Sequence, residues 1–135
     1  WEDVPVLAYK QVDSAPFRDV TRQVLFEDPA LACQWRYFEV APDGHTTLER
    51  HVHVHAVMIV RGRGECLVGD SIFTVDEHDL VKVPPLTWHQ FRAPPDAPLG
   101  FLCLVNVERD RPQLPDADDL AALRSDPRRA EFIRV

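Results

Sequence analysis

Short apolar segments recur along the chain and are separated by Pro, Gly, Asp and Asn residues. The segments are rich in β-branched, aromatic and aliphatic side chains, and their frequent interruption is typical of an all-β sandwich or barrel. The strands predicted from this pattern are Val4–Val12, Arg18–Glu27, Ala32–Val40, Thr46–His51, His55–Val60, Glu65–Val68, Ser71–Val75, Leu80–Val83, His89–Arg92 and Leu99–Val107.

Three of the interruptions carry residues that favour tight turns. Pro42–Gly44 predicts one hairpin, Gly69–Asp70 predicts another, and Pro84–Pro85 ends the strand before it. Strands joined by such turns run antiparallel. We therefore expect a largely antiparallel sheet.

One segment near the end of the chain has a helical period. Leu120 and Leu123 recur with alanines between them, after Asp residues that favour a helix N-terminus. We predict a helix at Asp116–Ser125, packed outside the sheet and preceded by a linker at Arg111–Pro115. The arginines near this region are interleaved with Asp residues and are interpreted as a solvated tail: Arg109, Arg111, Arg128 and Arg129.

Composition narrows the functional classes. The 135 residues are 45% apolar and 27% charged, which suits one folded domain, and the net charge of −7 argues against a surface that follows nucleic-acid phosphates. No apolar run approaches the ~20 residues that span a bilayer. Three widely spaced cysteines without a CxxC pair indicate buried thiols in a reducing compartment, so we expect a cytoplasmic protein: Cys33, Cys66 and Cys103.

Three of the six histidines and one glutamate occupy alternate positions: Glu49, His51, His53 and His55. Residues two apart on a strand share a face, so an extended segment would place all four on one side. A lone histidine on a strand is usually satisfied by a carbonyl or water, but clustered neutral imidazoles leave ring nitrogens that need a partner. One divalent transition metal ion, Fe, Mn, Ni, Co, Cu or Zn, would supply that partner.

The segment from Gly44 to Gly64, followed by Asp79 to His89, resembles the two sequence motifs of the cupin superfamily. In that family the first motif has a His-x-His pair, then a Glu opening the next strand, then a glycine six residues later. The second motif supplies a further histidine after a proline turn. The resemblance covers about residues 30–107 and implies a cupin-type jelly-roll β-barrel with a short C-terminal helix.

The second motif departs from the family pattern at two positions. His78 stands where a glycine is common, and Leu86 replaces the turn glycine. Pro84–Pro85 and the position of His89 are retained. The departures weaken the resemblance in the turn more than the assignment of His89 as a ligand.

Two alignments with the first motif remain open. Counting back six residues from Gly62 places His55 at the family's carboxylate position, with His51 and Glu49 on the histidine pair. The carboxylate is then displaced from the third ligand position to the first. The metal ligands implied by this alignment are Glu49, His51, His55 and His89.

The competing alignment places His51 and His53 on the histidine pair. It leaves Val57 at the carboxylate position, which would give an apolar residue the role of a ligand, so we favour the first alignment. In that alignment His53 lies in the turn between two strands, at the rim of the site.

Further residues are candidates for the substrate pocket. Phe91 lies two positions beyond His89 and should share its face, although a plain core role is equally open. Cys103 belongs to a late strand that passes beside the metal in similar barrels, so its thiol is a second candidate; a buried packing role is the alternative. Three neighbours on an earlier strand could bind an anionic or aromatic substrate, with inward direction undecided: Trp35, Arg36 and Tyr37.

The resemblance implies a function as well as a fold. Four protein ligands leave two adjacent positions on a six-coordinate ion, which favours a non-haem dioxygenase acting on a small phenolic or oxygenated substrate. The alternatives are a metal-dependent isomerase or lyase and a non-enzymatic small-ligand-binding cupin. We expect a single domain over residues 1–135, with a barrel core at 30–107 and a linker and helix at 108–135. A homodimer with a small-molecule substrate is expected, without nucleic-acid or membrane partners.

Overall fold

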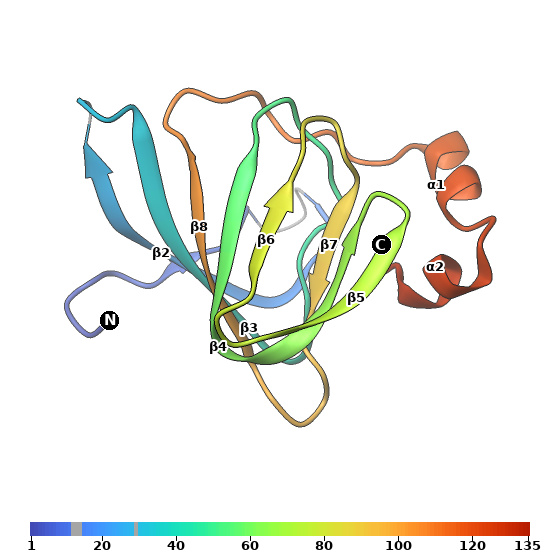
Figure 1. Cartoon of the computed structure of the whole chain (residues 1–135), viewed down its shortest axis with the longest axis horizontal. Helices are drawn as coiled ribbons and strands as arrows, with labels where there is room; N and C mark the ends of the chain where they lie inside the picture. Colours follow the sequence, from blue (N-terminus) through green and yellow to red (C-terminus); the bar gives the residue numbers. More distant parts are fainter. Residues whose placement is uncertain (12–14, 29) are drawn as a thin grey trace.

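A computed structural model describes residues 1–11, 15–28 and 30–135. The described strands form one antiparallel sheet that curves into a barrel, with two short helices packed beside it (Figure 1). Its elements are β1 (Leu7–Ala8), β2 (Arg18–Asp28), β3 (Cys33–His45), β4 (His55–Val68), β5 (Ser71–Asp76), β6 (Leu80–Val83), β7 (His89–Arg92), β8 (Leu99–Asn106), α1 (Ala117–Leu123) and α2 (Pro127–Phe132). The prediction of an all-β barrel is confirmed.

The long strand β4 connects the two walls of the barrel. Its first part pairs with β6 and β8, and its second part pairs with β5 and β7. An irregularity between Ile59 and Arg61, followed by Gly62 with φ of 68°, lies where the partners change. The sequence predicts two strands here, at His55–Val60 and Glu65–Val68. They are one strand because pairing continues through both glycines, with Gly62 opposite Leu99 on β8 and Gly64 opposite Val75 on β5.

The predicted hairpin at Pro42–Gly44 is wrong. β3 runs on to His45, because Asp43 donates its N–H to Pro94 O at 3.0 Å and Gly44 accepts from Ala93 N at 3.1 Å. These bonds to a distant segment supply the pairing that a hairpin would otherwise provide. The turn at Gly69–Asp70 does join β4 to β5, and Pro84–Pro85 follows β6 directly, as predicted.

Two of the predicted strands contain less regular β-structure than the sequence suggested. The segment Thr46–His51 forms isolated bridges at Glu49 and Arg50 rather than a regular strand. The segment Val4–Val12 forms only β1 within its described residues, and Val12 lies outside them.

The end of the chain folds into two helices, not one. α1 begins at a capping box formed by Asp116 and Asp119, which confirms a helix within the predicted range. The prediction missed α2, which starts at Pro127 after Asp126 has capped its N-terminus. Leu123 and Phe132 pack in a second apolar cluster with Leu48 and Leu67 on the barrel.

The main apolar cluster fills the inside of the barrel. Val40, Ile59 and Leu99 have no exposed surface within it. Phe91 and Phe101 belong to the same cluster, with ring centroids 4.8 Å apart, and both also line the cavity described below. The core therefore forms the floor of the candidate site. No helix in the described ranges has both the length and the apolar character needed to cross a membrane.

Candidate metal centre

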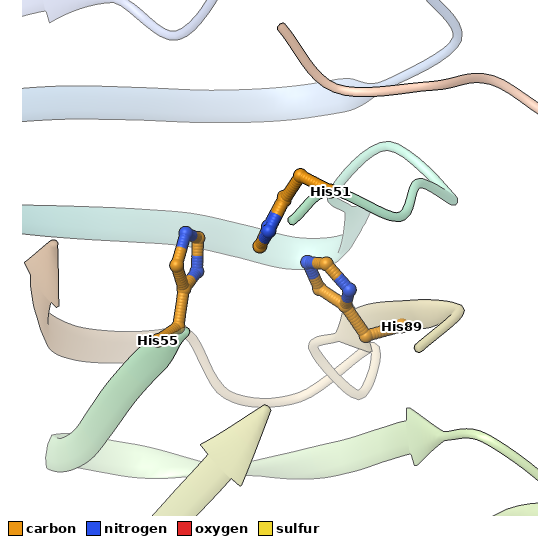
Figure 2. A group of neighbouring side chains, drawn as sticks. All are labelled: His51, His55 and His89. Atoms are coloured by element: carbon orange, nitrogen blue, oxygen red, sulfur yellow. The ribbon is translucent and has the colours of Figure 1, made fainter. Parts of the chain in front are cut away.

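Three histidines from two parts of the chain meet inside the barrel. His51 lies in the connection after β3, His55 opens β4 and His89 opens β7. One ring nitrogen from each lies within 4.8 Å of the others, and Figure 2 shows the three rings turned toward one shared space. His51 and His89 are buried, and His55 is half-buried.

Backbone contacts hold these histidines in place. His55 pairs with Val83 on β6, and His51 O accepts a hydrogen bond from Leu86 N at 2.7 Å. Both partners belong to the segment around the predicted proline turn, which also leads to His89. The two motifs are therefore tied together by the backbone.

The hydrogen bonds of the imidazole rings show which ring nitrogens are free to bind a metal ion. His51 Nδ1 lies 2.7 Å from His53 O, and His89 Nδ1 lies 2.9 Å from Thr87 O. A carbonyl accepts only from a protonated Nδ1, so the Nε2 of each ring carries the lone pair. The Nε2 atoms of His51 and His55 are buried without a hydrogen-bond partner. Orphaned nitrogens aimed at a common space fit a divalent transition metal ion.

Burial keeps these imidazoles neutral. It lowers the pKa of His51 to about 4, and the charges of His89 and His53 act in the same direction. Burial also lowers the pKa of His55 and the pKa of His89. Since a metal binds the unprotonated ring, the site is prepared for coordination at neutral pH.

Glu49 lies beside this group but is not one of the three. Its side chain is buried and forms an ion pair with Lys10. Its backbone bridges to His89, so the two side chains lie on the same face. The structure therefore brings Glu49 next to the centre, and its assignment as a ligand stays a prediction.

His53 lies in the bend between Glu49 and β4, where the favoured alignment places it. Its ring stacks on His51 at a centroid distance of 3.8 Å and an interplanar angle of 10°. Its Nδ1 lies 2.6 Å from Asp110 Oδ1. The contact with Asp110, which the sequence did not indicate, orients the His53 ring against His51.

A cavity of about 210 Å³ opens onto the histidines. Phe91 and Cys103 both line it, and Cys103 Sγ lies 3.5 Å from His55 Nδ1. Arg36 also lines it, whereas Trp35 is largely exposed and Tyr37 donates to Glu39.

Sequence reasoning missed several lining residues: Tyr9, Lys10, Arg22 and Arg109. The interpretation of the four late arginines as a solvated tail is wrong for Arg129, which is half-buried, pairs with Asp70 and donates to Leu123 O at 3.0 Å. Arg109 is exposed, as that interpretation expects, but it also lines the cavity. Arg22 had a usable signal, because it lies two positions beyond the core residue Val20 on β2 and shares its face.

Comparisons with known proteins place this fold and site in a family. The Cupin domain family matches residues 36–105, so the chain belongs to the cupins. It is 58% identical over 133 residues to 1-methylthio-D-xylulose 5-phosphate methylsulfurylase of Rhodospirillum rubrum, covering 98% of this chain and 85% of that protein.

Solved structures agree with this assignment. A cupin 2 conserved barrel domain protein from Rhodopseudomonas palustris has a TM-score of 0.95 at 64% identity, covering 100% of this chain and 93% of that one. A cupin-2 domain protein from Rhodospirillum rubrum has a TM-score of 0.92 at 58% identity, covering 98% of this chain and 88% of that one. The expected resemblance to cupins is confirmed.

Proposed function

We propose that this chain is a metal-dependent enzyme that acts on a small phosphorylated sugar carrying a methylthio group. The observation that carries the proposal is the cavity, which brings His51, His55 and His89 together with the Cys103 thiol. The relative from Rhodospirillum rubrum, similar along nearly the whole chain, bears the name of a methylsulfurylase for a methylthio sugar phosphate. That name supports the same substrate class here.

The proposed metal ligands are His51, His55 and His89, with Glu49 as the fourth. A divalent transition metal ion bound there would supply Lewis-acid chemistry by polarising an oxygen of the substrate. Glu49 is buried beside His89 and forms an ion pair with Lys10. Metal analysis of the purified protein distinguishes among Fe, Mn, Ni, Co, Cu and Zn.

The other side chains have separate tasks in this proposal. Phe91 and Phe101 form an apolar floor that excludes water from the bound sugar. Cys103 contacts His55 and is the thiol in the lining, so it would lie beside a sulfur-bearing substrate. His53 would keep His51 in position through ring stacking.

Dioxygenase chemistry on a phenolic substrate stays a second prediction. Arg22, Arg36 and Arg109 give the cavity a positive wall, which suits a phosphorylated substrate better than a neutral phenol. The relative's name describes chemistry on a methylthio group and mentions no oxygenation. We therefore favour the sugar phosphate.

The test is turnover of 1-methylthio-D-xylulose 5-phosphate under nitrogen, with and without a small thiol as acceptor. The protein is loaded with each candidate metal in turn, and the methylthio group is followed by NMR. Loss of that group is expected when the thiol is present, because the thiol sulfur then forms a disulfide with the methylthio sulfur and a proton replaces that group on the sugar carbon. The loss should be absent with the double variant His51→Ala/His89→Ala. An unchanged sugar with every metal, together with oxygen uptake on a phenolic substrate, would support the dioxygenase instead.

We also propose that two copies pair through the outer face of the barrel. Trp35 and Leu104 are direct partners across β3 and β8, and both are exposed. Leu104 also pairs with Ala56 on β4, two residues from the exposed Met58. Such neighbouring apolar side chains are typical of an interface. Light scattering should give twice the chain mass, and Trp35→Glu should shift it to the monomer mass.

Single-domain organisation and a cytoplasmic location complete the proposal. α1 and α2 pack on the barrel through Leu123 and Phe132, which supports one domain over residues 1–135. The cysteines support a reducing compartment, because Cys33, Cys66 and Cys103 are all free thiols. Fractionation of cells that produce the protein would test the location.

A further inference from the structure

Three arginines line the same cavity as the histidines. Arg22 lies on β2, Arg36 on β3 and Arg109 in the segment after β8. These strands are neighbours, since β3 pairs with β2 on one side and β8 on the other. The three guanidinium groups therefore belong to one wall of the cavity.

Each of these arginines has nitrogen atoms left over for a ligand. Arg36 is only 9% exposed; its Nε donates to Gln34 Oε1, and its Nη2 is buried without a partner. The Nε of Arg22 is likewise buried and unpartnered. Arg109 uses Nη1 for the carbonyls of Asn106 and Val107. Within the described part of the chain, the ion pairs include none of the three arginines.

The positive charge of this wall is not balanced within the cavity. Lys10 and Glu49 pair with each other, and the arginines repel one another. Burial lowers the pKa of Arg36 to about 10, and the charges of Arg109 and Arg22 act in the same direction. The group is still charged at neutral pH, so the wall holds a buried cation at Arg36, a half-buried one at Arg22 and an exposed one at Arg109. Buried donors on Arg22 and Arg36 have no partner. A dianion with several oxygen atoms would balance the positive charge and accept hydrogen bonds from the unused donors.

We propose that Arg22, Arg36 and Arg109 form a subsite for the phosphate group of the substrate. The inference rests on the proposed function and names the residues that hold one end of that substrate. Guanidinium groups suit phosphate because their planar donors match its oxygens in pairs. Arg36, the most buried of the three, provides the fixed contact, and Arg109 closes the subsite from the segment after β8.

The position of this subsite sets the direction of the bound molecule. Arg36 is the direct partner of Cys103 across β3 and β8, and Cys103 contacts His55. A small phosphate ester anchored at the arginines therefore extends past Cys103 toward the three histidines. The phosphate end and the reacting end occupy separate parts of one cavity.

Binding of inorganic phosphate tests the subsite directly. Isothermal titration at constant ionic strength compares the metal-loaded wild-type protein with Arg36→Gln, Arg109→Gln and the control Arg61→Gln. Arg61 is an exposed arginine paired with Glu39, outside the cavity. Because a hydrogen bond to a charged group is worth ~1.5–3 kcal/mol, each cavity variant should weaken phosphate binding by about ten-fold or more. Arg61→Gln should bind as tightly as wild type.

Two further measurements distinguish the loss of a phosphate contact from misfolding of the variant. Arg36→Lys keeps the charge without the paired donors and should fall between wild type and Arg36→Gln. Arg109 lies in an exposed segment, so Arg109→Gln should melt at the wild-type temperature. The proposal is overturned by wild-type phosphate affinity in both glutamine variants or by no saturable binding to wild type. The proposal is also overturned if phosphate binding is lost only in the double variant His51→Ala/His89→Ala, because phosphate would then bind the metal.

The same data separate this inference from the proposed function. Arginine-dependent phosphate binding without turnover of the methylthio sugar phosphate would refute the enzyme proposal and leave the subsite standing. Turnover with arginine-independent phosphate binding would refute the subsite alone.

Discussion

Glu49 and His89 are direct partners in an antiparallel bridge outside the regular strands. Glu49 N donates to His89 O at 3.2 Å, and His89 N donates to Glu49 O at 3.0 Å. Residues paired in this way carry their side chains on the same face. The bridge thus places a buried carboxylate next to one imidazole of the centre, although the two residues come from different motifs.

Metal content of purified variants tests the ligand set. His51→Ala and His89→Ala should lose nearly all bound metal, because each removes one of three converging nitrogens. Glu49→Gln should weaken metal binding by about ten-fold or more, and His53→Ala should weaken it less. Elemental analysis after dialysis gives the metal per chain, with the exposed His78→Asn as control. Loss in His53→Ala but not in Glu49→Gln would assign His53 as the ligand.

Asp110 should control the metal centre from outside it. Its carboxylate accepts from Val52 N at 2.7 Å and His53 N at 3.2 Å, and it holds the His53 ring. Desolvation raises the pKa of Asp110, but these hydrogen bonds outweigh it and keep that pKa below its ordinary value. Asp110→Ala should release the bend and weaken metal binding by about ten-fold or more.

Metal titration of Asp110→Ala, followed by isothermal calorimetry, measures this effect. Asp96→Ala is the matched control, because it removes an exposed carboxylate that pairs with Arg63 and lies outside the cavity lining. Equal metal affinity in both variants would show that Asp110 has no influence on the centre.

Much of the barrel could be predicted because its local signals agree with its long-range pairing. The strands at Leu80–Val83 and His89–Arg92 match the prediction at both ends. There, apolar alternation coincides with proline turns. The turn at Gly69–Asp70 was equally predictable, since Gly69 adopts φ of 62° in the hairpin.

The features that the sequence did not predict depend on contacts with residues that are distant in the chain. Asp43 has turn chemistry, yet bonds to the segment around Pro94 keep it inside β3. Arg109 belongs to a charged segment that resembles a solvated tail, and its place in the cavity follows from how the chain turns after β8. The bend at His53, by contrast, agrees with the favoured alignment, which places that residue in a turn between two strands.

Gly62 should tolerate no side chain. Its φ is 68°, and a Cβ atom there would lie 2.0 Å from Pro98 O. Gly62→Ala should lower the free energy of unfolding by about 2–3 kcal/mol, from backbone strain and the clash together. Gly69 has a similar φ of 62°, but its nearest atom would be 3.5 Å away. Gly69→Ala should therefore cost about 1–2 kcal/mol, from strain alone. Urea unfolding measures both, and equal losses would contradict the role of Pro98.

His45 should contribute to acid sensitivity. Burial lowers its pKa below the ordinary 6.5, and the charges of Arg92, Arg134 and Arg18 lower it further. The unfolded chain therefore takes up a proton at a higher pH than the folded protein, so stability falls as pH drops below the unfolded value. His45→Asn should lose less melting temperature than wild type between about pH 7.5 and about pH 5.5. A chelator removes metal effects, and an identical loss would exclude His45.

Cys103 should be required for turnover but not for metal binding. Burial raises its pKa to about 12 although Arg36 and Arg109 lower it, so the group is a neutral thiol at neutral pH. It lies between the arginine wall and His55, where a methylthio sugar phosphate would touch it. Cys103→Ser should lower kcat by on the order of a hundred-fold, the scale for a group at the reacting atoms. Its metal content and phosphate affinity should match wild type.

The half-exposed Cys33 lies outside the cavity lining, so Cys33→Ser is the matched control and should keep wild-type turnover. Steady-state kinetics with the methylthio sugar phosphate compare the two variants. If Cys103→Ser kept full turnover, the thiol would be a packing residue in the wall. If it lost its metal instead, the contact with His55 would position the ligand and the sulfur would have no part in the reaction.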